Sequence, residues 1–125
     1  MSDLKKFKKL LKKLNIPFKI NGFVIEIDKI YFNNMEDFAI YFFDENSKFK
    51  DFMCYPNNFE NKDYKIIPNA KYLFLKLLKE LNIEFQEIGN DIKIDSFYSD
   101  GMDGLYLSFN ENGDFKYFNW KEFEF

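Results

Sequence analysis

The chain has 125 residues, is 22% aromatic and carries a formal charge of −3, and all 18 of its basic residues are lysines. It has no His or Arg and one cysteine, Cys54. This composition excludes an intrachain disulfide, the usual zinc sites, Ser-His-Asp and Cys-His catalytic arrangements, and bidentate arginine clamps on phosphate. No apolar run approaches the roughly 20 residues of a membrane helix. We therefore expect a cytoplasmic protein without a cofactor and without enzymatic activity.

The composition is strongly biased. Phe, Tyr, Ile, Asn and Lys make up 70 of the 125 residues, and all five have codons rich in A and T. This bias indicates the genome of a low-GC bacterium, its phage or a related mobile element. The hydrophobic content of 46% is sufficient for one compact domain with a core.

The first predicted element is an amphipathic helix near the N-terminus. Its apolar residues follow three-four spacing: Leu4, Phe7, Leu10, Leu11 and Leu14. Ser2 or Asp3 can cap its start, and Asn15 suits the left-handed position that ends a helix.

Two hairpins are predicted to follow this helix. Their strands are Ile16–Ile20 with Phe23–Ile27, around Asn21-Gly22, and Phe38–Phe43 with Lys48–Tyr55. An Asn-Gly pair between alternating apolar residues favours a two-residue type I′ turn.

The same series is predicted again in the second half. A helix with the stripe Phe74, Leu77, Leu78 and Leu81 follows Asn69, its candidate cap, and Asn82 can end it. The strands that follow are Ile83–Ile88 with Asp91–Ile94, around Gly89-Asn90, and Leu105–Phe109 with Asp114–Trp120.

A shift of 67 residues aligns residues 4–35 with 71–102 and gives 15 identities over 32 positions, and a shift of 66 continues the match. We interpret this as a tandem duplication with copies at 1–66 and 67–125, packed as one domain. The predicted fold is α+β: a helix plus a four-stranded antiparallel sheet, twice, related by a pseudo-twofold axis with the helices on one side of the sheets. In element order this fold resembles cystatin-like and β-lactamase-inhibitor-protein-like folds.

The two copies differ on the helices. Tyr72, Leu73 and Leu75 replace three lysines of the first helix, so the second helix is expected to be buried on more than one side. These three residues are candidates for a contact between the repeats or for a homodimer interface.

Charge is also segregated along the chain. Residues 1–20 carry a net charge of +6, and residues 84–125 carry −7. Lys5, Lys6, Lys9 and Lys13 are therefore candidate contacts for an anionic partner such as nucleic acid or a lipid surface. The alternative is an ordinary solvated lysine face.

An acidic connection, with Asp95, Asp100 and Asp103 among two glycines, is a weak candidate for a hard cation or for the lining of a ligand pocket. Its spacing does not match an EF-hand, and an ordinary acidic loop is the alternative, so no metal is predicted.

The predicted partner-binding surface is an aromatic sheet face. If the second hairpin of each half has a three-residue loop, the outward residues include Tyr106, Lys116, Phe118, Trp120, Phe42 and Phe52. A register error of one residue would exchange the two faces.

These features favour a non-catalytic inhibitor that occludes another protein, of the anti-CRISPR, anti-defence or immunity type, with a host defence or toxin component as its partner. One alternative is a pocket protein that sequesters or hydrolyses a small ligand with acidic residues between the repeats. A third is nucleic-acid binding through the first helix.

Overall fold

The chain folds as an α+β protein with two helices and two mostly antiparallel sheets, one of four strands and one of five, which confirms the predicted class at this level. The computed structural model describes residues 2–44, 48–58, 60–94 and 102–122. Within these residues, no helix has the length and apolar character needed to cross a membrane.

The first helix, α1 (Asp3–Lys13), begins and ends where the sequence predicts. Ser2 is the N-cap, and its Oγ accepts a hydrogen bond of 3.3 Å from the Lys5 amide. Asn15 takes the left-handed conformation after the helix, with φ of +58°. Leu4, Phe7, Leu10 and Leu11 are buried on one side of α1.

The first half supplies all of the four-stranded sheet, in the order β1-β2-β4-β5. The bounds are β1 (Phe18–Asn21), β2 (Val24–Ile27), a 3-10 turn η1 (Lys29–Tyr31), β3 (Phe32–Asn33), β4 (Met35–Phe42) and β5 (Phe49–Pro56). The β1–β2 turn consists of Gly22 and Phe23, with positive φ at Gly22, so the predicted type I′ turn at Asn21-Gly22 is wrong. Phe7 of α1 packs against Phe42 and Phe52 of this sheet.

The second half supplies α2 (Lys71–Glu80), β6 (Gln86–Ile88), β7 (Asp91–Ile94), β8 (Met102–Phe109) and β9 (Phe115–Glu122). The N-cap of α2 is Ala70 and not the predicted Asn69, which instead takes φ of +56°. Asn82 ends α2 in the left-handed conformation, as predicted. Phe74 of α2 packs against Phe109, Phe115 and Phe118.

The five-stranded sheet, in the order β3-β9-β8-β7-β6, contains one strand from the first half. Strand β3 pairs in parallel with β9 through Phe32 and Phe118, and Ile67 bridges to Phe115 further along the same edge. Beside this edge, the Trp120 indole N–H donates a hydrogen bond to the Asn34 carbonyl. The β3–β9 pairing and the Trp120–Asn34 hydrogen bond connect the two halves through backbone as well as side chains.

Corresponding hairpins of the two halves pair in the same register. Phe42 pairs with Phe49 as Phe109 pairs with Phe115, and Phe38 pairs with Cys54 as Leu105 pairs with Trp120. In each of the two hairpins the strand register shifts at two places, and these places correspond to each other in the two halves.

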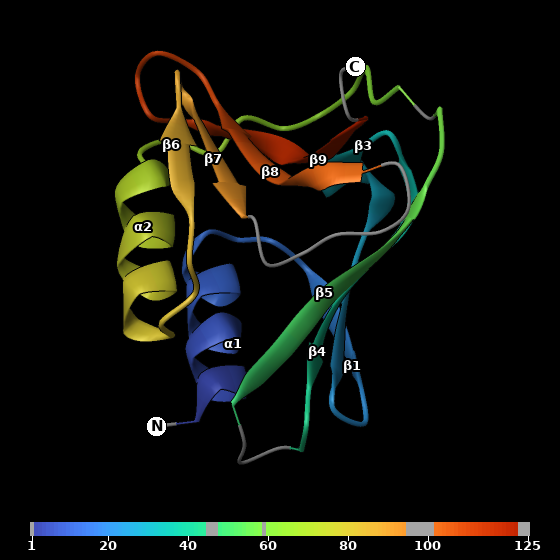
Figure 1. Cartoon of the computed structure of the whole chain (residues 1–125), viewed down its shortest axis with the longest axis vertical. Coiled ribbons are helices and arrows are strands. Elements are labelled where there is room, and N and C mark those ends of the chain that lie inside the picture. The colour runs from blue at the N-terminus through green and yellow to red at the C-terminus, as the bar shows by residue number, and fades with distance from the viewer. Residues whose placement is uncertain (1, 45–47, 59, 95–101, 123–125) are drawn as a thin grey trace.

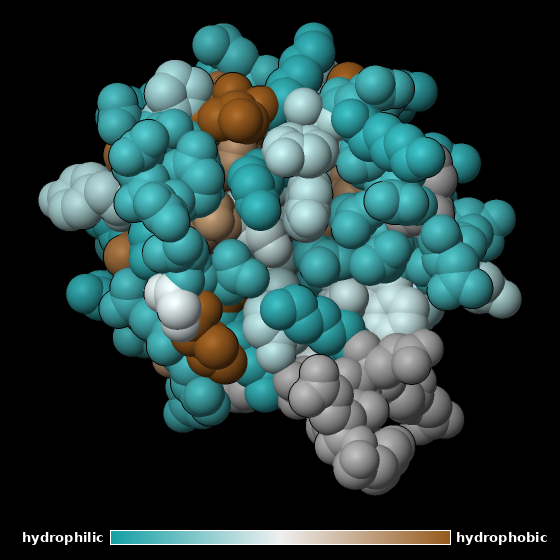
Figure 2. Space-filling model, turned by 90° about the horizontal axis from the view of Figure 1, so that it is seen from above, coloured by the Kyte–Doolittle hydropathy of each residue, from teal (hydrophilic) through white to brown (hydrophobic). Residues whose placement is uncertain are grey.

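The cores of the two sheets meet as one cluster of buried residues. Phe38 of β4 stacks on Phe118 of β9, with ring centroids 4.7 Å apart and an interplanar angle of 22°. Both helices lie side by side, and their chain directions are opposite (Figure 1). Seen from above, the surface is mainly hydrophilic with small separate hydrophobic spots (Figure 2).

The predicted outward orientation of Phe52, Phe118 and Trp120 is wrong, because a β-bulge interrupts each of the two long hairpins. Lys50 and Lys116 are the extra residues of these bulges. An extra residue reverses the inward-outward alternation beyond it. Phe118 and Phe52 are therefore buried, and Trp120 is half-buried against the core instead of facing outward.

The remaining residues of that predicted surface are also buried or half-buried, so they offer a partner little accessible area. Phe42 is buried beneath α1, where its ring packs edge-on against Phe7. Tyr106 does face the other side of its sheet, but it is only 5% exposed, and the Lys121 ammonium lies 4.4 Å from its ring centroid. Lys116 is half-buried in its bulge.

The contact between Phe38 and Phe118 is expected to contribute to stability. We expect Phe38→Ala to lower the free energy of unfolding by about 3–5 kcal/mol, since it empties space between the two sheets. Phe43→Ala, at a ring that is 65% exposed, is the matched control and should change it by less than about 1 kcal/mol. Urea unfolding of both variants measures this, and equal losses would show that the sheets do not depend on this contact.

The inward position of Cys54 is expected to make its thiol react slowly. Burial raises the pKa of the Cys54 thiol from 9.0 to about 12, so at pH 8 the folded protein holds far less of the reactive thiolate than the unfolded chain. We expect a disulfide reagent to react with the native protein on the order of a hundredfold more slowly than in guanidinium. Because Cys54 is the only cysteine, the signal is unambiguous. Native and unfolded rates within about tenfold of each other would place the thiol at the surface.

Candidate functional site

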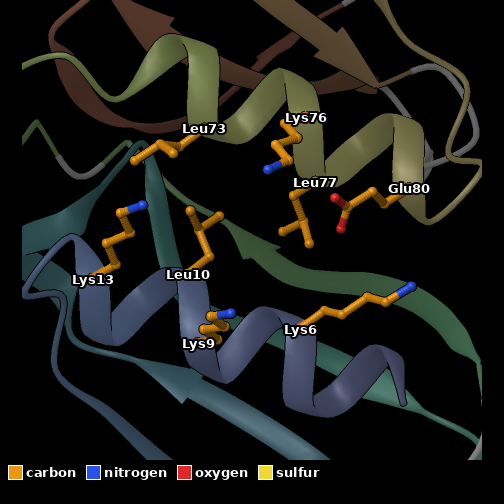
Figure 3. A pocket seen from close by; sticks show the side chains of 8 residues that line it. All are labelled: Lys6, Lys9, Leu10, Lys13, Leu73, Lys76, Leu77 and Glu80. Atoms are coloured by element: carbon orange, nitrogen blue, oxygen red, sulfur yellow. The ribbon is translucent and has the colours of Figure 1, made fainter. Parts of the chain in front are cut away.

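The main candidate site is a groove between the two helices, with a volume of about 350 Å³. Leu10 and Leu77 are buried and form its floor, and Leu73 is half-buried beside them. Figure 3 shows the side chains of α1 and α2 that surround this floor. The charged ones are Lys6, Lys9 and Lys13 from α1 and Lys76 and Glu80 from α2.

The groove is built from equivalent positions on the two helices. Its residues on α1 are 6, 9, 10 and 13, and those on α2 are 73, 76, 77 and 80, so each differs by the same 67 residues. This i, i+3, i+4, i+7 spacing places four side chains along one stripe of each helix. The groove is therefore lined by two matching stripes that run in opposite directions.

The centre of the groove is the same from both helices, and its two ends differ. Lys9 and Lys76 are equivalent to each other, as are Leu10 and Leu77. At one end Lys13 lies across from Leu73, and at the other Lys6 lies on the same side as Glu80 (Figure 3). The middle of the groove therefore has the same residues on both helices, whereas its two ends carry different residues and give it a direction.

The groove carries an excess of positive charge, because it has four lysines against one glutamate. None of these lysines forms an ion pair with a described residue. Lys9, Lys13 and Lys76 are exposed at the rim, while the leucines below them are apolar. Such an arrangement can bind a ligand that is anionic at its sides and apolar in its middle.

A second hollow, of about 490 Å³, extends the groove at the Lys13 end. It shares Lys13 and Leu73 with the groove and adds residues of the segment that leads into α2, including Lys65 and Ile66. The combined surface is therefore elongated, and its extension is also cationic and apolar.

Sequence reasoning identified part of this site. Of the four lysines predicted to contact an anionic partner, Lys6, Lys9 and Lys13 line the groove and Lys5 does not. Lys76 was missed, although its identity with Lys9 in the shifted alignment is a signal that could have indicated it.

The residues that distinguish the second helix have three different environments. Leu73 lines the groove between α1 and α2, and Leu75 packs against the core. Tyr72 is 72% exposed, so it is not buried between the repeats, and its candidate role in a homodimer interface stays a prediction. It points away from the apolar stripe because the stripe positions of α2 are Phe74, Leu77 and Leu78.

A separate hollow of about 760 Å³ lies on the outer face of the four-stranded sheet. Its lining includes Ala39, Phe18 and Tyr41, together with the acidic residues Glu26 and Asp37. The position equivalent to Ala39 in the other sheet is Tyr106, whose large side chain is buried. A small residue thus leaves space on one sheet that a tyrosine occupies on the other.

The acidic candidates Asp95 and Asp100 lie outside the described residues, as does the side chain of Asp103. The predicted cation or ligand site at this connection therefore stays a prediction.

No family model, curated protein sequence or solved structure matches this chain. The inter-helix groove and the hollow over Ala39 are consequently the features from which function is inferred. The groove carries the stronger chemical signature, because its lysines and leucines come from matching positions on two helices.

Proposed function

We propose that the protein is a non-catalytic binding protein whose inter-helix groove takes an acidic segment of a partner protein. The observation that carries this proposal is the row of lysines above a floor of leucines. None of these lysines, Lys9, Lys13 and Lys76, pairs with an acid in the part of the chain that the structure describes. Carboxylates of the partner would pair with the lysines, and its apolar side chains would contact Leu10 and Leu77.

The groove favours a protein over a nucleic acid. Sequence-independent binding of single strands uses aromatic side chains on which bases stack, and none of the eight lining residues is aromatic. Phosphate contacts need only lysines, but they make no use of an apolar floor. Nucleic-acid binding through α1 is therefore the weaker candidate.

We infer that the groove arose by tandem duplication of a unit of one helix and four strands. The support is the common 67-residue offset of the lining residues, the equal hairpin registers and the bulges at Lys50 and Lys116. In this view the groove lies on the pseudo-twofold axis. Its central lysines and leucines are inherited from one ancestral pair, and Leu73 and Glu80 changed later.

The biological setting that we propose rests on composition. The AT-rich codon bias suits a phage or mobile element of a low-GC bacterium, and the absence of His and Arg suits an inhibitor better than an enzyme. An anti-defence or immunity protein that occludes a host defence or toxin component would have these features.

The groove proposal is tested by reversing charge on the same two helices, inside and outside the groove. We expect Lys9→Glu with Lys76→Glu to weaken partner capture from a low-GC bacterial lysate by about tenfold or more, since two favourable pairs become repulsive. Lys12→Glu with Lys79→Glu is the matched control, because both lysines are exposed and outside the groove. Quantitative mass spectrometry of the captured proteins is the measurement.

Two results would contradict the proposal. One is a partner that is captured equally by the groove variant and the parent. The other is capture that disappears on nuclease treatment, which would favour nucleic-acid binding through α1.

The hollow over Ala39 supports a second candidate, binding of a small ligand on the outer face of the four-stranded sheet. Seven of its twelve lining residues are apolar or aromatic and five are charged, and ligand pockets likewise combine apolar walls with polar groups that orient the ligand. The charged residues provide both signs: Lys19 and Lys29 against Glu26, Asp28 and Asp37.

Ala39→Tyr tests this second candidate by placing on this sheet the residue that the other sheet has at Tyr106. We expect the variant to fold with a stability change of about 1 kcal/mol or less and to lose any fragment that binds the hollow. A fragment library screened by ligand-observed NMR against parent, Ala39→Tyr and the control Met53→Tyr measures this. Fragments that bind all three proteins equally would exclude the hollow as their site.

A further inference from the structure

We infer that the segment bound in the inter-helix groove is an acidic amphipathic α-helix, which packs as a third helix against α1 and α2; this rests on the proposed function. The groove has the shape that two adjacent antiparallel helices provide, and a third helix can place its side-chain ridge into that depression. The occupant would present leucine-like residues to Leu10 and Leu77 and carboxylates to the lysines at the rim.

The spacing of the lining residues matches a helical ligand. Each wall has four lining residues at i, i+3, i+4 and i+7: three lysines and one leucine on α1, and two leucines, one lysine and one glutamate on α2. An amphipathic helix has an apolar stripe with acidic flanks at the same spacing. Carboxylates on its two flanks would face Lys9 on one wall and Lys76 on the other.

The backbone chemistry of the groove disfavours an extended peptide. Both walls are helices whose backbone groups are already hydrogen-bonded, and the floor is leucine. Lysine ammonium groups donate hydrogen bonds but accept none, so the only side-chain acceptor for the N–H groups of an extended chain would be Glu80. A buried N–H without a partner is costly, whereas a helix satisfies its own backbone.

The length of the surface fits a short helix. Positions 6 to 13 of α1 span about 10 Å at 1.5 Å per residue. The hollow beyond Lys13 extends this path toward Lys65 and Ile66. A helix of about ten to fourteen residues would cover the whole path.

The two ends of the groove give the bound helix a direction. Lys13 and Lys65 make one end cationic, and Glu80 offsets Lys6 at the other. The more acidic end of the bound helix therefore lies at Lys13. Glu80→Lys would give α2 the residue that α1 has at its equivalent position and would make both ends cationic.

Fluorescence anisotropy with three labelled peptides tests this inference. The first has Leu at i, i+3, i+4 and i+7 with Glu at the flanking positions, the second has the same residues in strict alternation, and the third is oligoglutamate of the same length. We expect the helical peptide to bind the parent about tenfold more tightly than either of the others and to gain helical circular dichroism on binding. The groove variant Lys9→Glu with Lys76→Glu should lose this binding, and the control Lys12→Glu with Lys79→Glu should keep it.

Two further variants test the inference by an expected gain in affinity for the helical peptide. Glu80→Lys should tighten binding of the helical peptide several-fold, and Glu84→Lys, which makes the same charge change outside the groove, should change it much less. If the alternating peptide binds as tightly as the helical one and depends equally on Lys9 and Lys76, the helix inference is wrong and the proposed acidic partner stands. If no peptide depends on these lysines, both are overturned.

Discussion

The structure depends on the contact between the apolar faces of its two sheets. Each half has a helix that covers its own sheet, as Phe7 covers Phe42 and Phe74 covers Phe109. Phe38 and Phe118 then join these two layers into one core. The addition of β3 to the sheet of the other half fixes the same arrangement through backbone hydrogen bonds. The two halves therefore share one core and one sheet.

The groove follows from that packing. Once both sheets are buried against each other, α1 and α2 lie side by side in opposite directions, and their facing stripes meet at Leu10 and Leu77. Leucines fill only the bottom of the space, since lysines at the neighbouring positions extend into solvent and do not pack. The result is a shallow apolar channel with a cationic rim. Its position is set by the core, while its charge is set by residues that the core does not need.

Most helix ends were predicted, because short-range chemistry decides them, although the predictions of the Asn69 cap and of the type I′ turn at Asn21-Gly22 were wrong. Ser2 caps α1, and Asn15 and Asn82 end both helices, because side-chain hydrogen bonding and tolerance of positive φ act within a few residues. The exposed faces of the long hairpins were not predicted. The only mark of their bulges in the hydrophobic pattern is a spacing of three residues, from Phe49 to Phe52 and from Phe115 to Phe118, and one extra residue is enough to turn Phe118 inward.

The positive charge of the candidate site could be predicted from the sequence. The position of the groove between the two helices could not. The lysines of the first helix are visible in the sequence, as is their replacement by Leu73 on the second. That Lys9 and Lys76 share one groove depends on how the two sheets pack, which is a long-range property. The hollow over Ala39 is likewise apparent only when the outer faces of the two sheets are compared, with Tyr106 as the counterpart.

Lysine footprinting shows whether the inter-helix groove binds the partner. Because every basic residue is a lysine, acetylation rates read by mass spectrometry report on every cationic side chain in one experiment. With the captured partner bound, we expect protection of Lys9, Lys13 and Lys76 and unchanged rates at Lys5, Lys12 and Lys79. Protection of Lys5 and Lys12 with unchanged rates at Lys9 and Lys76 would contradict binding in the groove.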